Sequence, residues 1–150
     1  MSSEARAPTV LLADDHPLVR LSVRDELERA GFVVCAEAST AEEAIAAAAR
    51  ELPDLCVLDI SMPGDGFHAA VEIRRQTPDT LVVMLTASAQ ETHVLEAVRA
   101  GAHGYCLKDD DPTRLPMALH DVLAGIPAFP RRLSIGLVDA ARATLEAAPD

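Results

Sequence analysis

Short runs of apolar residues alternate five times with amphipathic segments along this sequence of 150 residues. Each run has the length of a strand that is buried on both faces, as the strands of a parallel sheet are. The segments between the runs have the length and apolar spacing of helices, and a helical crossover joins neighbouring strands in parallel. The alternation therefore predicts one doubly wound α/β domain with a parallel sheet.

Helix signals sharpen these boundaries. Pro17 suits the first position of a helix, and Thr40 with Glu43 and Ser88 with Glu91 have the spacing of capping boxes. Together with the apolar runs, they predict the flavodoxin-like (βα)5 arrangement, with five strands in the order 2-1-3-4-5. The expected strands cover residues 9–13, 32–37, 54–59, 81–86 and 103–108, and the expected helices cover 17–30, 41–51, 67–76, 89–100 and 114–124.

The core is expected to be aliphatic, because 49% of the residues are hydrophobic while the sequence contains three Phe, one Tyr and no Trp. The expected apolar stripe of the first helix consists of Leu18, Leu21, Val23, Leu27 and Ala30. Three cysteines fall in expected strands and lack CxxC spacing. We expect them to be buried free thiols of a reducing cytosol: Cys35, Cys56 and Cys106.

The chain divides into a main domain over residues 1–125 and a C-terminal part over residues 126–150. Residues 125–130 contain two prolines and are expected to form a stiff linker, and residues 131–147 carry apolar side chains at helical spacing. This last helix could connect to a further domain, dimerise or pack on the main domain. The sequence leaves these alternatives open.

The formal net charge of −11 argues against direct binding to nucleic acid, because no basic stripe is present to neutralise phosphates. It also argues against binding to an anionic membrane surface. No apolar run has the length of a membrane-spanning helix, and the first residues lack the order of a signal peptide. These observations predict a cytoplasmic protein.

Polar side chains stand where four of the expected strands end. Asp14 and Asp15 follow the first strand, Asp59 ends the third, Thr86 ends the fourth and Lys108 ends the fifth. In the expected strand order these ends share one edge of the sheet, where α/β proteins bind ligands. Three carboxylates in one place suit Mg²⁺, while Lys108 and Thr86 would face a phosphoryl group. Asp59 would be the nucleophile that forms an acyl phosphate.

These residues resemble the receiver domain of bacterial two-component response regulators. The motifs are Asp14-Asp15, Asp59-Ile-Ser-Met-Pro-Gly64, Thr86-Ala87 and Gly101-Ala-His-Gly-Tyr-Cys-Leu-Lys108, and they span roughly residues 8–125. The stretches Asp-Asp-His-Pro-Leu-Val-Arg and Gly-Ala-x-Gly-Tyr-x-Leu-Lys-Asp are similar to the NarL/FixJ (LuxR-type) subfamily.

The resemblance implies a role for each matching residue. Asp59 would accept phosphate from a sensor histidine kinase. Asp15 would contact Mg²⁺ directly, Asp14 mostly through water, and the backbone carbonyl of Ser61 would complete the shell. Lys108 would pair with the phosphate.

Two further pairs of residues match positions that the family uses to switch and to time its signal. Thr86 would turn inward, and Tyr105 would follow into the space that Thr86 vacates; Tyr105 as a mere half-buried strand aromatic remains an alternative. Ser61 and Ser88 occupy the two rate-tuning positions, and because both are short and polar, water could reach the acyl phosphate.

The sequence departs from the family pattern in three places. The loop Met62-Pro63-Gly64-Asp65-Gly66 is one residue shorter than the commoner form, and Lys108 is followed by Asp109 rather than proline. Three successive acids, Asp109 to Asp111, also lie near Lys108 and could weaken its hold on phosphate. Five histidines lack metal-ligand spacing and are expected on the surface or in loops: His16, His68, His93, His103 and His120.

Other functions fit these motifs less well. A nucleotide-binding fold would place glycines after the first strand, where this chain has two acids. A hydrolase of the haloacid dehalogenase type would need an aspartate where Ser61 stands. A degenerate or free-standing receiver that acts as an interaction module without phosphorylation remains the main alternative. A NarL/FixJ-type output, with a homodimer on phosphorylation, would require a DNA-binding helix-turn-helix domain that residues 126–150 do not provide.

Overall fold

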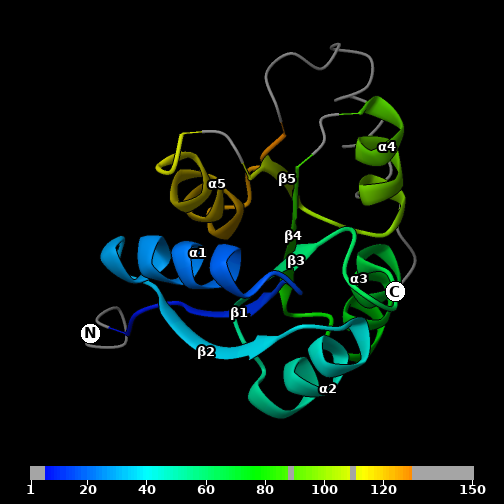
Figure 1. The fold of residues 1–150 in the computed structure, drawn as a ribbon, viewed down its shortest axis with the longest axis horizontal. Helices are drawn as coiled ribbons and strands as arrows, with labels where there is room; N and C mark the ends of the chain where they lie inside the picture. Colours follow the sequence, from blue (N-terminus) through cyan, green and yellow to red (C-terminus); the bar gives the residue numbers. More distant parts are fainter. Residues whose placement is uncertain (1–5, 88–89, 109–110, 130–150) are drawn as a thin grey trace.

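A computed structural model of the chain describes residues 6–87, 90–108 and 111–129. Its centre is a five-stranded sheet in the order β2-β1-β3-β4-β5, and every neighbouring pair of strands is parallel (Figure 1). The predicted fold and strand order are therefore confirmed. The strands are β1 (Thr9–Ala13), β2 (Val33–Ala38), β3 (Leu55–Asp59), β4 (Leu81–Thr86) and β5 (Gly104–Leu107).

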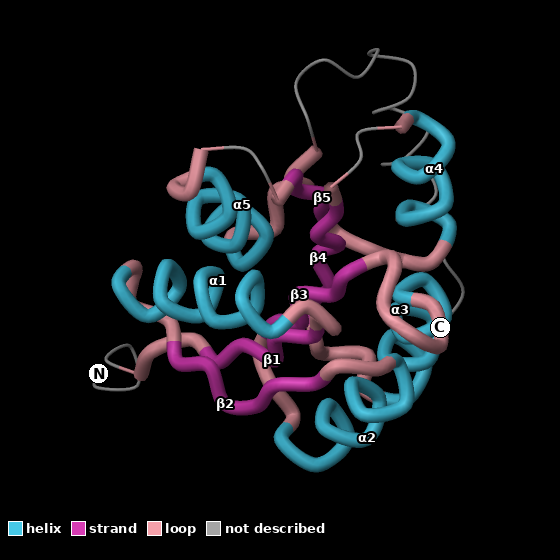
Figure 2. Tube along the Cα trace, in the orientation of Figure 1, coloured by secondary structure: helices cyan, strands magenta, loops and turns pink. Residues whose placement is uncertain are grey.

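Helices cover both faces of the sheet. α1 and α5 lie on one face, and α2, α3 and α4 lie on the other (Figures 1 and 2). This is the doubly wound arrangement that right-handed crossovers between parallel strands produce. The helices are α1 (Pro17–Arg29), α2 (Ala41–Glu51), α3 (Gly66–Gln76), α4 (Glu91–Arg99) and α5 (Arg114–Leu123).

The two faces of the sheet form two aliphatic cores. One core packs Leu12, Val57 and Leu85 against α1 and α5, and the other packs Leu11 and Leu58 against α2, α3 and α4. β3 is buried along its whole length because it lies at the centre of the sheet and is covered on both sides. Burial of this kind holds the end of β3, and the aspartate on it, in a fixed position.

The predicted start of α2 agrees with the structure, whereas the predicted start of α4 does not. Thr40 is the N-cap of α2 as predicted, since the Glu43 amide donates to the Thr40 hydroxyl over 3.1 Å, but the Glu43 carboxylate accepts from the Ser39 amide rather than from the Thr40 amide, so the capping box is only half formed. α4 begins at Glu91 rather than at residue 89, with Gln90 as its N-cap residue and no side-chain capping bond. Ser88, the predicted cap of α4, lies outside the described residues.

The expected apolar stripe of α1 is only half right. Leu27 is fully buried and Val23 packs against the core, but Leu18 and Leu21 are 77% and 63% exposed. With 3.6 residues per turn, Leu18 and Leu21 lie on a different face of α1 from Val23 and Leu27, so the expected residues do not form one stripe. The sheet contacts the face that carries Val23 and Leu27, and this turns Leu18 and Leu21 toward solvent.

The cysteines lie in β2, β3 and β5 as free thiols, but only Cys56 is fully buried. Cys35 and Cys106 are partly exposed because β2 and β5 are the edge strands of the sheet, so the expectation of burial is wrong for these two. Burial raises the pKa of the Cys56 thiol well above its ordinary range, which keeps it protonated.

The chain returns to the sheet after α5. Ala128 bridges to Gly104, the Tyr105 amide donates to the Ala128 carbonyl over 2.8 Å, and the Ala128 amide donates to the His103 carbonyl over 3.0 Å. The first part of the expected linker thus lies along the open edge of β5. The predicted helix over 131–147 lies outside the described residues.

Within the described part of the chain, no helix is both long and apolar enough to cross a membrane.

Candidate functional site

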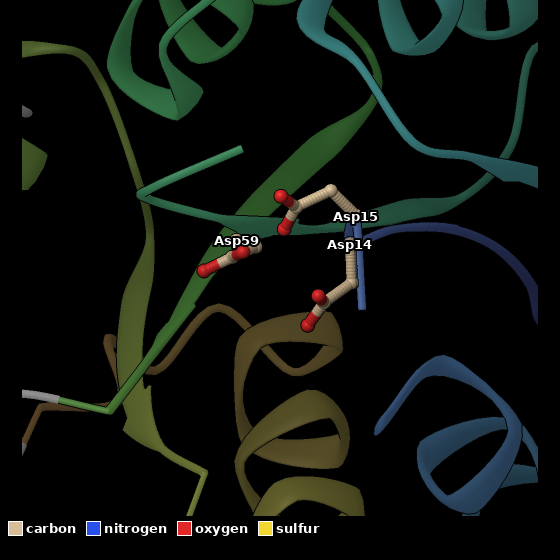
Figure 3. Close-up of side chains that lie close together, drawn as sticks. All are labelled: Asp14, Asp15 and Asp59. Atoms are coloured by element: carbon tan, nitrogen blue, oxygen red, sulfur yellow. The ribbon is translucent and has the colours of Figure 1, made fainter. Parts of the chain in front are cut away.

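The polar residues singled out from the sequence meet at the carboxyl edge of the sheet. Asp14 directly follows β1, Asp59 ends β3, Thr86 ends β4 and Lys108 directly follows β5. These four strands are neighbours in the sheet, so their ends lie side by side. Figure 3 shows the three aspartates grouped at the ends of β1 and β3.

The three aspartates form a compact acidic cluster. Asp14, Asp15 and Asp59 each offer one carboxylate oxygen, and these atoms lie within 4.8 Å of one another. Asp14 and Asp59 are 0% and 1% exposed, whereas Asp15 lies open to solvent. Buried like charges at this distance repel each other strongly unless a cation neutralises them.

Lys108 supplies one such cation. Its Nζ lies 2.9 Å from Oδ2 of Asp14 and 3.2 Å from Oδ1 of Asp59, so the ammonium bridges the two buried carboxylates. Burial by itself lowers the pKa of Lys108, but the hydrogen bond to Asp14 and the charges of both aspartates outweigh burial and raise it. Lys108 is therefore firmly cationic in the site.

One lysine does not satisfy three acids. Burial, reinforced by the charge of Asp14, raises the pKa of Asp59 even though Lys108 opposes the shift. Oδ2 of Asp59 is buried without a hydrogen-bond partner among the described residues. An unpartnered carboxylate oxygen beside two further acids fits a hard divalent cation such as Mg²⁺, which takes carboxylate, carbonyl and water oxygens.

The other oxygen of Asp59 faces the loop that follows β3. The amide and the hydroxyl of Ser61 lie 3.3 Å and 3.4 Å from Oδ1 of Asp59. These contacts turn Oδ1 toward Ser61 and Lys108 and leave Oδ2 as the free acceptor. Ser61 is exposed, so solvent reaches this side of the site.

The shortened loop after β3 closes through a tight turn. Asp65 has a φ of +78°, which is uncommon for a residue other than glycine, and its carboxylate caps α3 by accepting from the Phe67 amide over 2.8 Å. The Gly66 amide donates to the Ile60 carbonyl over 3.0 Å. α3 consequently starts at Gly66, directly against the end of β3.

Thr86 and Tyr105 lie together at the ends of β4 and β5. Both side chains are buried, and they are hydrogen-bonded to each other. Burial raises the pKa of Tyr105, while the bond with Thr86 lowers it, and burial wins. The resemblance predicts that Tyr105 moves inward when Thr86 turns. The ring is already only 2% exposed, so it is fully buried rather than half-buried, and its role as a switch stays a prediction.

One residue that contacts the site, Arg20, was not predicted from the sequence. Nη1 of Arg20, in α1, donates to the main-chain oxygen of Asp14 over 2.6 Å, and its Nε donates to Glu37 over 2.9 Å. The only available signal was an arginine on the helix that follows the acidic pair. Helical spacing alone does not say which way so long a side chain turns.

His103 is the other residue whose role was missed. It lies just before β5, outside the strand expected over residues 103–108, and it is half-buried, with its Nδ1 accepting from the Val82 amide over 3.1 Å. Burial, and then the charge of Arg74, lower the pKa of His103 to about 4 from its ordinary value of 6.5. The imidazole is thus a neutral structural acceptor that joins the start of β5 to β4.

This histidine makes stability depend on pH. The unfolded chain takes up the proton near pH 6.5 and the folded chain near pH 4, so the unfolded state binds more protons in between. We expect stability to fall as the pH falls through this interval, by up to about 3 kcal/mol from His103. His103→Asn, which keeps an acceptor for the Val82 amide, should remove this part of the pH dependence. Urea unfolding from about pH 7.5 to 4 measures it, and parallel profiles for both proteins would contradict the prediction.

Known proteins that resemble this chain are response regulators. The family model described as the response regulator receiver domain matches residues 10–120. The nitrate/nitrite response regulator protein NarL of Escherichia coli K12 is 39% identical over 127 residues, which are 83% of this chain and 58% of that protein. The chain thus spans less than two thirds of this relative.

Solved structures share the fold over almost the whole chain. A two-component response regulator of the LuxR family from Aurantimonas is 33% identical with a TM-score of 0.79, covering 92% of this chain and 97% of the other. A structure of two RcsB dimers bound to two parallel DNAs is 26% identical with a TM-score of 0.77, covering 94% of this chain and 69% of the other.

Proposed function

This chain belongs to the response regulator receiver domain family, and on that premise we propose that Asp59 is its phosphoacceptor and that a sensor histidine kinase is the phosphate donor. The observation that carries the proposal is Oδ2 of Asp59, a buried carboxylate oxygen without a partner among the described residues. Oδ1 of the same carboxylate lies 3.2 Å from the ammonium of Lys108, and two further acids are adjacent. Receivers of this family act by phosphorylation of an aspartate. Oδ2 of Asp14 is also buried without a hydrogen-bond partner, but it forms the 2.9 Å ion pair with Lys108, whereas Oδ2 of Asp59 forms no ion pair with any described residue.

The transfer forms a bond between phosphorus and an oxygen of Asp59 while the bond from phosphorus to the donor nitrogen breaks. Asp59 must be ionised to attack, and Lys108 favours the ionised form. The ammonium of Lys108 can then pair with an oxygen of the phosphoryl group. Asp14, Asp15, Asp59 and the backbone carbonyl of Ser61 would hold Mg²⁺, which would supply positive charge near the phosphoryl oxygens.

Thr86 and Tyr105 are proposed as the switch that reports this modification. The Thr86 hydroxyl lies at the end of the neighbouring strand and would turn to hydrogen-bond the phosphoryl group, giving up its bond to Tyr105. The surface around α4 and β5 would change with it, which is how a local charge biases a two-state element. Ser61 and Ser88 would tune hydrolysis, so the domain would catalyse its own phosphorylation and dephosphorylation and nothing else.

The output is proposed by analogy with longer relatives. Because the chain spans 58% of NarL, we assign the output to a further domain, a DNA-binding helix-turn-helix, with the receiver controlling homodimer formation. The net charge of −11 fits a chain that does not contact DNA itself. A cytoplasmic site of action, where the kinase domain and DNA are both accessible, follows from the same proposal.

Intact-protein mass after incubation with acetyl phosphate tests the proposal. We expect a Mg²⁺-dependent gain of one phosphoryl group that Asp59→Asn abolishes. The asparagine side chain would keep the shape of the site, so a lost adduct would reflect the missing nucleophile. If wild type gains no adduct and beryllofluoride also fails to bind, the domain is a degenerate receiver that works through protein contacts alone. An adduct that persists in Asp59→Asn would place the acceptor elsewhere.

A further inference from the structure

The turn that carries the two aspartates Asp14 and Asp15 is held by a contact from outside the turn. Arg20 reaches back from α1 and donates from Nη1 to the main-chain oxygen of Asp14 over 2.6 Å. That oxygen belongs to the peptide unit that joins Asp14 to Asp15. A charged donor on a carbonyl makes a stronger hydrogen bond than a neutral one.

The other polar groups of Asp14 are also bound. Its amide donates to the Ala38 carbonyl over 2.9 Å, Oδ1 accepts from the His16 amide over 2.9 Å, and Oδ2 pairs with Lys108. These contacts fix the residue and its carboxylate. The bond between Oδ1 and the His16 amide closes a ring that includes the Asp14–Asp15 peptide, and Arg20 adds a second, charged contact to the carbonyl of that same peptide.

Arg20 is itself anchored on the opposite side. Its Nε donates to Oε1 of Glu37 over 2.9 Å, and Glu37 lies near the end of β2. The guanidinium therefore bridges α1, the end of β1 and the end of β2. The side chains of both residues are mostly covered, with 23% and 30% exposed, so the bridge is partly shielded from water.

Asp15 depends on this bridge. Its side chain is exposed and has no hydrogen bond or ion pair with any residue that the structure describes. The direction of its carboxylate is consequently set by its backbone, and the peptide bonded to that backbone is the one that Arg20 holds.

We propose that Arg20 is a positioning residue for the metal site, because its bond to the Asp14 carbonyl aims the Asp15 carboxylate at the oxygens of Asp14 and Asp59. The inference rests on the proposed function, since Mg²⁺ is the cation that the site would take. Residues that orient metal ligands without touching the metal commonly change its affinity by ten- to a hundredfold.

The sign of the effect separates positioning from simple electrostatics. Arg20 is a cation near an acidic cluster, so its charge alone repels Mg²⁺. Removing that charge would therefore tighten Mg²⁺ binding if electrostatics were the only effect. Positioning has the opposite consequence, because a misaimed Asp15 would weaken Mg²⁺ binding.

Calorimetric titration of the phosphate-free protein with Mg²⁺ tests this without any measurement of activity. We expect Arg20→Met to weaken Mg²⁺ binding by about tenfold. The matched control is Arg24→Met, because Arg24 pairs with Glu37 and Glu28 rather than with the Asp14 carbonyl. This control should leave the affinity unchanged or slightly tighter.

Arg20→Lys keeps the charge but loses the planar fork that joins the Asp14 carbonyl to Glu37. Arg20→Lys should also weaken Mg²⁺ binding, and it replaces Arg20→Met as the test variant if Arg20→Met does not fold. Equal or tighter binding in the Arg20 variants than in Arg24→Met would overturn the proposal. If the wild-type protein does not bind Mg²⁺ at all, both the proposed metal site and this inference are wrong. If the wild-type protein binds Mg²⁺ and the Arg20 variants bind it equally well, only the role of Arg20 is contradicted.

Discussion

Replacing Lys108 with methionine is expected to lower the free energy of unfolding by about 3 kcal/mol at neutral pH without Mg²⁺. The ammonium lies 2.9 Å from Asp14 and 3.2 Å from Asp59, and its loss leaves two buried carboxylates facing each other. Acid should restore part of the stability, because burial and Asp14 already raise the pKa of Asp59, which is then protonated first. Mg²⁺ should stabilise the variant more than wild type, since it replaces the missing charge.

Urea unfolding with and without Mg²⁺, near pH 7 and near pH 5, measures these effects. Arg114→Met is the control, because it removes one positive charge from an exposed position of α5 and should change stability by less than about 0.5 kcal/mol. Phosphoryl uptake by Lys108→Met should fall at least about a hundredfold, as expected when a charge that stabilises the transferring group is removed. A variant as stable as Arg114→Met at neutral pH, with no added response to Mg²⁺, would contradict this role of Lys108 in the acidic cluster.

Gly66→Ala is the second substitution from which we expect a large effect. A Cβ at this position would overlap the main-chain oxygen of Asp59 and lie 2.8 Å from the Cα of Ile60. These are backbone atoms at the end of a buried strand, so α3 or β3 would have to shift. We expect a loss of about 3 kcal/mol, although alanine normally favours a helix.

The same shift would displace the carboxylate of Asp59, so phosphoryl uptake per folded molecule should fall more than about tenfold. Gly125→Ala is the control: its φ of +86° makes alanine unfavourable there, but no atom lies within 4 Å of the added Cβ. It should destabilise the protein by only about 1 kcal/mol and leave phosphorylation unchanged. Equal effects of the two substitutions in thermal unfolding would show that α3 packs on β3 more loosely than the structure indicates.

The fold and most of the candidate site were predictable because they depend on local patterns and on topology. Five apolar runs separated by helical segments permit few arrangements other than a doubly wound parallel sheet. The carboxyl ends of its strands then share one edge, so the polar residues after the apolar runs had to meet there. Asp14, Asp59, Thr86 and Lys108 were placed together on that reasoning, and the structure brings them together.

The predictions that were wrong concern choices that local pattern leaves open. Leu27 comes nine residues after Leu18, so the two lie on opposite sides of a helix with 3.6 residues per turn, and only the side that carries Leu27 is buried. The helix expected from residue 89 starts at Glu91, with Gln90 as its N-cap residue. Cys35 and Cys106 lie on edge strands, which a strand pattern does not distinguish from central ones.

The remaining features of the site depend on contacts between segments that are distant in the sequence. Arg20 could have turned to solvent, and Lys108 could have paired with one acid rather than two, because long flexible side chains have many directions available. Only the packing of α1 against β2 and of β5 beside β4 selects one direction for each. The same packing buries Tyr105 against Thr86 and makes His103 a neutral acceptor. The residue types and the strand order thus follow from the chain, whereas the bonds among long side chains follow from the assembled layers.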